Sequence, residues 1–130
     1  YVDKLLEFLY IDINTHRIAS NVYSKMKNSE QADYHIKFAD YLLLSILKSG
    51  NGRSFETAFF VVDVREEYYV LDFWDVKLIS QSYCEYNGHE YDILLCINPK
   101  TEEKKEKYFN IDLPKKWFRN NLIIPDEINF

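Results

Sequence analysis

The stretch Ser49-Gly-Asn-Gly-Arg-Ser-Phe-Glu-Thr-Ala-Phe59 separates two kinds of sequence pattern. Before it, apolar residues recur every three or four positions, which is typical of α-helices. After it, β-branched and aromatic residues cluster as they do in β-strands. Two of the three glycines, Gly50 and Gly52, lie in this stretch. We expect them to end the preceding helix and to take the positive φ angles of a tight turn before the first strand.

The segment before residue 49 predicts helices. Residues 1–10 have the pattern of the last turns of a helix whose beginning is missing. Asn14 and Thr15 are the expected cap of a second helix, over about residues 15–27, because short polar side chains at a helix start bind free backbone N–H groups.

A third helix is expected over residues 28–48. Asn28 followed by Gln31 is a capping-box pattern that predicts its start. The second and third helices together resemble one tetratricopeptide repeat, in which small residues lie where two antiparallel helices cross. The residues that carry this resemblance are Ala19, Tyr23, the run Asn28-Ser-Glu-Gln-Ala32, Ile36 and Ala39.

Residues 57–64 are rich in β-branched and aromatic residues and predict a buried strand. A short helix over residues 64–74 follows, with Asp63 and Glu66 as its cap-and-box pair. Glu67 adds a third acid at this helix start, where the helix dipole favours negative charge. Capping explains these acids without a metal or an acid–base site.

Asn87-Gly88 predicts a β-hairpin between residues 77–86 and 89–98, because this dipeptide is the strongest two-residue turn signal. If Tyr86 pairs with His89, the two cysteines lie on opposite faces of the hairpin. We therefore predict two reduced thiols, with Cys84 more buried than Cys96. The face expected to pack in the core holds Leu78, Ser80, Ser82, Cys84, Tyr86, Tyr91, Ile93, Leu95 and Ile97.

A last strand is predicted over residues 106–112 and is ended by Pro114. The tail, residues 115–130, is amphipathic and is expected to pack back on the sheet, since its apolar residues would otherwise be exposed. The fold class that follows is α+β. A tetratricopeptide-like helical segment, residues 1–48, leads into an antiparallel sheet with one packed helix, residues 49–130. We expect the two segments to pack together as one domain.

Composition excludes several classes of function. The net charge is −5, so the basic surface that binds a phosphate backbone is missing, and we predict no nucleic-acid partner. No apolar run is long enough to form a transmembrane segment. The spacing of Cys84 and Cys96 matches no metal site, and we predict neither a metal nor a cofactor.

The loop Gly50-Asn-Gly-Arg-Ser54 superficially resembles a phosphate-binding loop. A P-loop, however, leads from a strand into a helix and carries a lysine, whereas this loop leads from a helix into a strand and carries Arg53. We therefore reject nucleotide binding and predict a structural turn, to which Ser54, Glu56 and Thr57 hydrogen-bond. The candidate binding residues of the chain are Arg53, Ser54, Glu56 and Thr57.

No catalytic residue is predicted. Nucleophilic catalysis needs a Ser or Cys beside a His and an orienting acid. His16 and His35 lie on predicted helices and His89 lies beside the hairpin turn, so we do not expect the three histidines to converge.

Several segments resemble one uncharacterised family. They are Tyr34-His35, residues 43–59, residues 62–68, Gln81-Ser82, residues 88–92 and residues 108–114. These segments are similar to a family of domains of unknown function found in Bacteroidetes, over roughly residues 19–114. The resemblance implies an extracytoplasmic protein (periplasmic, secreted or lipid-anchored) and no activity, so no functional residue is carried over. It fits a chain that does not begin with methionine and is expected to be a piece of a longer protein.

The predicted function is a non-enzymatic interaction or accessory module outside the cytoplasm, which binds a protein or peptide through the helical pair and the aromatic sheet. Two alternatives come from other classes. One is a hydrolase-like enzyme with a site near residues 50–57, using Ser54, Glu56 or Thr57 with the acids of residues 63–67. The other is a small acidic inhibitor or immunity-type protein, suggested by size and charge.

Overall fold

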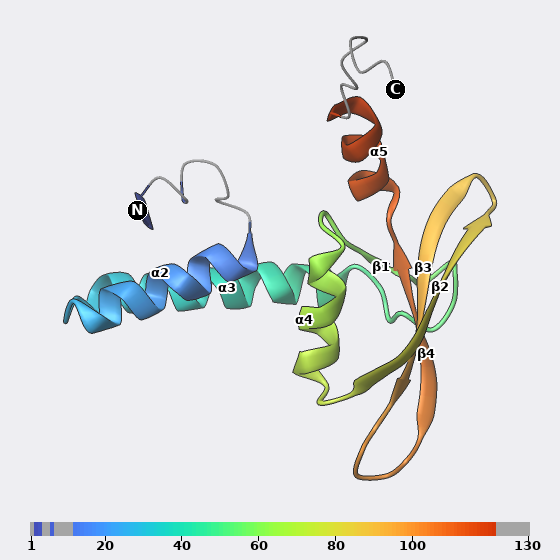
Figure 1. The fold of residues 1–130 in the computed structure, drawn as a ribbon, viewed down its shortest axis with the longest axis horizontal. Coiled ribbons are helices and arrows are strands. Elements are labelled where there is room, and N and C mark those ends of the chain that lie inside the picture. Colours follow the sequence, from blue (N-terminus) through green and yellow to red (C-terminus); the bar gives the residue numbers. More distant parts are fainter. Residues whose placement is uncertain (1, 4–5, 7–11, 122–130) are drawn as a thin grey trace, which may run out of the picture. The chain divides into compact units, whose positions relative to one another are not determined.

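The chain divides into two compact units, unit 1 (Tyr1–Lys48) and unit 2 (Ser49–Phe130). The computed structural model describes residues 2–3, 6 and 12–121. The helix predicted over residues 1–10 therefore falls largely outside the described part. Figure 1 shows helices α2 and α3 in unit 1, and strands β1 to β4 with helices α4 and α5 in unit 2. The predicted α+β class is confirmed.

Unit 1 is an antiparallel helix pair, α2 (Ile13–Lys25) and α3 (Ser29–Lys48), joined by a short turn. Small residues lie where the helices meet. Ala19 is completely buried, and Ser20 Oγ donates to the carbonyl of Ala32 at 2.8 Å. Small side chains at these positions allow the two helix axes to approach closely.

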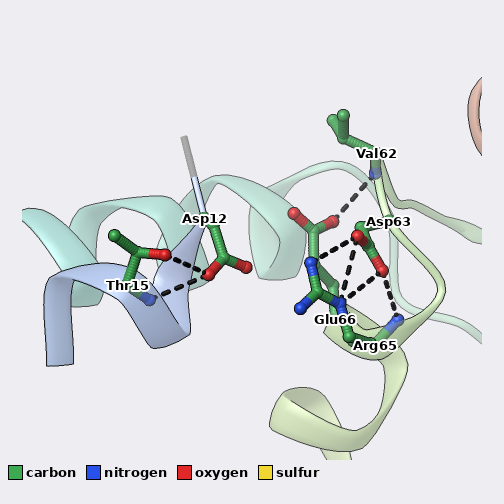
Figure 2. Close-up of polar contacts among 6 residues, drawn as sticks. All are labelled: Asp12, Thr15, Val62, Asp63, Arg65 and Glu66. Carbon is green, nitrogen blue, oxygen red and sulfur yellow. Dashed lines mark hydrogen bonds and ion pairs between the residues drawn. The ribbon is translucent and has the colours of Figure 1, made fainter. Parts of the chain in front are cut away.

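The start of α2 differs from the prediction. The N-cap is Asp12, whose Oδ2 accepts the backbone N–H of Thr15 at 2.8 Å and its hydroxyl at 2.7 Å (Figure 2). Asn14 and Thr15, the predicted cap, therefore lie inside the helix. The predicted start of α3 is confirmed, because Asn28 Oδ1 accepts the N–H of Gln31 at 3.2 Å.

Unit 2 is built on a four-stranded sheet with the strand order β1-β4-β3-β2. The strands are β1 (Phe59–Phe60), β2 (Lys77–Tyr86), β3 (His89–Ile97) and β4 (Lys104–Asn110). Strands β2, β3 and β4 are antiparallel neighbours, as predicted, whereas β1 runs parallel to β4, so the sheet is mixed.

Strand β1 has two residues and is much shorter than the predicted strand over residues 57–64. Phe59, which pairs with Phe109, is 1% exposed and packs in the core of unit 2. Directly after β1, the N–H of Val61 still donates to the carbonyl of Asn110 at 3.4 Å, and the N–H of Val62 donates to the carboxylate of Glu66 at 2.8 Å.

The predicted hairpin is confirmed together with its register. Tyr86 pairs with His89, and Asn87 and Gly88 have φ angles of 53° and 80°. Both central residues of a type I′ turn need positive φ, which Asn and Gly adopt readily. The bulge between Leu78 and Ser80 was not predicted.

The predicted core face of the hairpin is wrong for most of its length. Helix α4 (Arg65–Phe73) packs on the opposite face, where Leu94 and Cys96 are 0% and 2% exposed. Both cysteines are free, as predicted, but Cys84 is only half-buried and so is the less buried of the two. The bulge also places Leu78 opposite Cys96, on the face that α4 covers.

Both glycines of the central stretch are required by close contacts. Gly52 has φ +68°, and a Cβ there would lie 2.2 Å from the ring of Phe59. The predicted positive φ is wrong for Gly50, whose Cβ would instead lie 2.3 Å from the carbonyl oxygen of Thr57. Gly50 is needed for the close approach of two backbone segments.

Helix α5 (Asp112–Asn121) follows β4 directly and was not predicted. Pro114 does not end the strand, which stops at residue 110. It lies in the first turn of α5, where a missing N–H leaves no helical carbonyl unpaired. Trp117 and Phe118 are 66% and 57% exposed, so the predicted packing of the tail is wrong for them. Residues 122–130 lie outside the described part.

Candidate functional site

Three of the four candidate binding residues of the central loop, Ser54, Glu56 and Thr57, contact one another or the end of β2. Ser54 Oγ and Thr57 Oγ1 lie 2.9 Å apart, and Ser54 Oγ also accepts the N–H of Thr57 at 3.3 Å. Glu56 accepts the hydroxyl of Tyr86 at 3.1 Å. Hydrogen bonds from its own N–H and then from Tyr86 hold the pKa of Glu56 below its usual value. Arg53 is exposed.

The predicted cap-and-box pair of Asp63 and Glu66 is wrong, because the N-cap residue of α4 is Val64 and has no side-chain cap hydrogen bond. Figure 2 shows the contacts that these two acids make instead. Asp63 Oδ1 accepts the N–H of Arg65 at 2.9 Å, and the side chains form an ion pair at 2.7 Å. The hydrogen bond from Arg65 holds the pKa of Asp63 below its usual value. Glu66 binds the N–H of Val62, one residue before the box position. Hydrogen bonds in the turn and beside the start of α4 therefore engage the side chains of Ser54, Thr57, Asp63 and Glu66.

Glu67, the third acid of α4, is 1% exposed and lies against Asp92 of β3. Burial, followed by the hydrogen bond and the charge of Asp92, raises the pKa of Glu67 to about 9. Glu67 therefore keeps its proton at neutral pH and donates it to the Asp92 carboxylate. Its Oε1 is buried without a hydrogen-bond partner. Both carboxyl groups are shielded from solvent, so the pair ties α4 to the sheet.

An open cleft of about 630 Å³, here called the hairpin-end cleft, lies between the turn of the β2–β3 hairpin and helix α5. Two segments that are distant in the sequence supply its polar groups. The lining residues are Glu85, Tyr86, Asn87, Gly88, His89, Glu90, Asp112, Lys116 and Arg119.

His89 and Asp112 form an ion pair in this cleft. Asp112 Oδ2 lies 2.6 Å from His89 Nδ1, and Asp112 Oδ1 accepts the N–H of Glu90 at 2.8 Å. Partial burial alone would raise the pKa of Asp112, but hydrogen bonds from Glu90 and His89 outweigh it and hold that pKa below its usual value. An ionised Asp112 can only accept, so Nδ1 of His89 carries the proton and Nε2 is left for a ligand.

A second ion pair, between Arg119 and Glu90, lines the same cleft. Arg119 forms an ion pair with Glu90, whose Oε1 also lies 2.7 Å from the hydroxyl of Tyr83. The hydroxyl of Tyr83 lies 2.9 Å from Glu85 as well. The hydrogen bond to Glu90, with further contributions from both acids, raises the pKa of Tyr83. These contacts hold the side chain of Glu90 between Tyr83 and Arg119 of α5.

The sequence interpretation missed this pairing of His89 with Asp112. The two residues are 23 positions apart, and the pairing of β3 with β4 brings them together, with Tyr91 opposite Asn110. The N–H of Asp112 also donates to Asn110 Oδ1 at 3.0 Å. The sequence features that could have indicated the pair are a histidine at the first position of one strand and an acid two residues after the end of the next strand.

The expectation that the histidines do not converge is wrong for His16 and His35. Their Nδ1 atoms lie 2.9 Å apart inside unit 1, and both side chains are buried. Burial and then the charge of His16 lower the pKa of His35. The rings are stacked against Phe38 and Tyr23, respectively. The sequence feature that could have indicated this contact is the position of His35 on the apolar stripe of α3.

Among the described residues, strand β2 is an edge of the sheet with no further strand beside it. It is ten residues long, and every residue except Cys84 is exposed. Four large apolar or aromatic side chains lie along it, namely Leu78 (37% exposed), Ile79 (46%), Tyr83 (49%) and Tyr86 (42%). Only Lys77 and Glu85 are charged.

Within the described residues, no group of three or more His, Cys, Asp or Glu side chains is arranged to hold a metal ion. The helices in the same part of the chain lack the length and apolar character that crossing a bilayer requires.

The chain has an α+β fold, with a helix pair in unit 1 and a mixed sheet with an open polar cleft at its hairpin end in unit 2. The chain belongs to the family described as a domain of unknown function (DUF4919), whose model matches residues 1–119. This membership confirms the predicted resemblance to a domain-of-unknown-function family. No curated protein and no solved structure matches the chain.

Proposed function

We propose that this protein is an interaction module whose partner is an extended segment of another protein that adds to the free edge of β2. The observation that carries the proposal is the exposure of nearly the whole ten-residue edge strand. An edge strand has backbone N–H and C=O groups without a sheet partner, and an extended peptide can pair with them while its side chains contact exposed apolar residues.

The edge carries few of the features that normally protect such strands. Natural sheets cover long edges or place charges, prolines and bulges on them. In β2 a bulge follows Leu78, and Lys77 is the strand's only cation. Residues 80–84 are uncharged and exposed or half-buried, which suits pairing with a partner strand.

The helical pair supplies a second surface in this proposal. Buried small residues at its crossing, Ala19 and Ala39, support a tetratricopeptide-like hairpin in unit 1. An extracytoplasmic location and an origin in Bacteroidetes belong to the same proposal, and the sequence resemblance described above supports them.

The test places a photoreactive phenylalanine analogue at position 83 or, as a control, at position 41. Tyr83 and Tyr41 are both exposed, and Tyr41 lies on α3. We expect position 83 to crosslink one extended segment of a protein from the native host, and position 41 not to. Binding of the purified partner is then measured for two variants. Ser82→Lys is expected to weaken the binding at least tenfold, because a charge on an edge strand opposes pairing. Ser45→Lys on α3 should leave the affinity unchanged. Equal crosslinking at both positions, or full affinity of Ser82→Lys, would refute the proposal.

A further inference from the structure

We infer that the hairpin-end cleft binds a neutral, hydroxyl-rich ligand of the saccharide type. The first argument comes from His89. Asp112 engages Nδ1 of His89 at 2.6 Å, which leaves Nε2 facing a ligand, and no hydrogen bond to Nε2 is found among the described residues. A hydroxyl group can pair with this nitrogen in either protonation state of the ring, because a hydroxyl both donates and accepts.

The charges of the lining give the second argument. Three carboxyl groups, from Glu85, Glu90 and Asp112, accompany two permanent cations, Lys116 and Arg119. Arg119 is already paired with Glu90. The cleft therefore has no positive excess to attract an anion, and it offers both donors and acceptors. A hydroxyl group can satisfy both, since it donates once and accepts twice.

Tyr86 supplies an aromatic surface at the edge of the cleft. Its ring stacks on Phe55, with centroids 4.3 Å apart and an angle of 13° between the planes, and its hydroxyl is held by Glu56. The ring is nevertheless 42% exposed and lines the cleft. A fixed, partly exposed aromatic ring beside hydrogen-bonding groups can pack against the C–H face of a sugar ring while the hydroxyls are bound at its edge.

The fixed geometry of the polar groups completes the argument. Asp112 is held through both carboxylate oxygens, by His89 and by the N–H of Glu90. The Asn87-Gly88 turn beside them is exposed, and nothing lies within 4 Å of a Cβ at Gly88. Ligand hydroxyls would thus meet groups whose orientation is set before binding, which lowers the entropy lost on association.

The experiment titrates the full, ¹⁵N-labelled chain with the methyl glycosides of glucose, galactose, mannose and N-acetylglucosamine. Sodium phosphate and sodium acetate are the charged controls. We expect at least one glycoside to give saturable shifts at the amides of Asn87 and Gly88 and at the ring of His89. No saturable shift with any of the four glycosides overturns the inference, and so does tighter binding of phosphate than of every glycoside.

Variants then assign the contacts. Asp112→Asn and His89→Gln are each expected to weaken the bound glycoside about tenfold, the equivalent of one hydrogen bond. His89→Gln keeps the hydrogen bond that the Glu90 N–H donates to Asp112, so it remains informative if Asp112→Asn loosens α5. Asp63→Asn removes an exposed acid of another ion pair and should bind as the unmodified chain does. Unchanged affinity in His89→Gln overturns the inference.

Discussion

Replacement of Glu67 by glutamine should stabilise unit 2, although Glu67 is one of the most buried side chains of the chain. Glu67 is 1% exposed, and its protonated carboxyl donates to Asp92. A glutamine amide has nearly the same shape and can donate an N–H to the same carboxylate. The carboxyl oxygen Oε1, which has no partner in the native protein, would be replaced by an amide oxygen in the same position.

The size of the effect follows from the pKa of Glu67. Its carboxyl has an ordinary pKa of 4.5 in the unfolded chain and about 9 in the folded protein. Between these values the folded state holds a proton that the unfolded state has lost, so the free energy of unfolding falls by about 1.4 kcal/mol per pH unit. The stabilisation is complete below pH 4.5 and is lost as the pH rises toward 9. At pH 7 the loss is about 3 kcal/mol, which glutamine avoids.

Urea unfolding of the unmodified chain and of Glu67→Gln at pH 5, 7 and 9 tests this. Both tryptophans of the chain, Trp74 and Trp117, lie in unit 2, so their fluorescence reports on that unit. We expect the difference in the free energy of unfolding to be small at pH 5 and to grow toward about 3 kcal/mol at pH 7. Glu66→Gln is the matched control on the same helix and should not be stabilised, because the Glu66 carboxylate accepts the N–H of Val62.

A difference between Glu67→Gln and the unmodified chain that stays constant from pH 5 to pH 9 would refute the reasoning. It would mean that Glu67 ionises in the folded state as it does in the unfolded state. A loss of stability in Glu67→Gln at pH 7 would refute it as well, since the amide would then be a poorer partner for Asp92 than the carboxyl group.

Two further predictions concern other parts of the chain. Gly52→Ala should destabilise unit 2 by about 2–4 kcal/mol in urea unfolding, through positive φ and the clash with Phe59, whereas Gly88→Ala, which meets no neighbour, should lose only about 1–2 kcal/mol. The stability of unit 1 should fall as the pH drops below 6.5, because burial and His16 lower the pKa of His35 and the unfolded chain takes up the proton first. Urea unfolding followed by NMR of the α2 and α3 amides measures this. An equal loss of stability below pH 6.5 in the His35→Gln variant would contradict this prediction.

The elements that the sequence predicts well have local causes. Asn87-Gly88 needs no distant contact to favour a type I′ turn, and Asn28 reaches the N–H of Gln31 within one helical turn. The core face of the hairpin has no such local cause. Alternate residues on both faces of β3 are apolar, so the pattern does not say which face α4 will cover, and Leu94 and Cys96 are buried because of that packing.

The candidate site shows the same limit. The loop candidates Ser54 and Thr57 are near one another in the sequence and do meet, but they hydrogen-bond to each other. His89 and Asp112 meet only because β3 and β4 pair in one register, with Tyr91 opposite Asn110. A shift of this register by two residues would separate them, and hydrophobic alternation alone does not distinguish registers that differ by two.

The dipeptide Asn-Gly occurs twice in the sequence, and the two occurrences have different structural roles. In Asn87-Gly88 both φ angles are positive and the glycine has open space around it, so the turn depends on its own backbone. In Asn51-Gly52 both N–H groups donate to the carbonyl of Thr57, and the Gly52 carbonyl accepts the N–H of Tyr108. A side chain at Gly52 would strike Phe59 in β1. The central loop is therefore fixed by the sheet to which it is attached. Substitutions in this loop should change the assembly of unit 2. Ligand binding is to be tested at the other Asn-Gly turn, Asn87-Gly88.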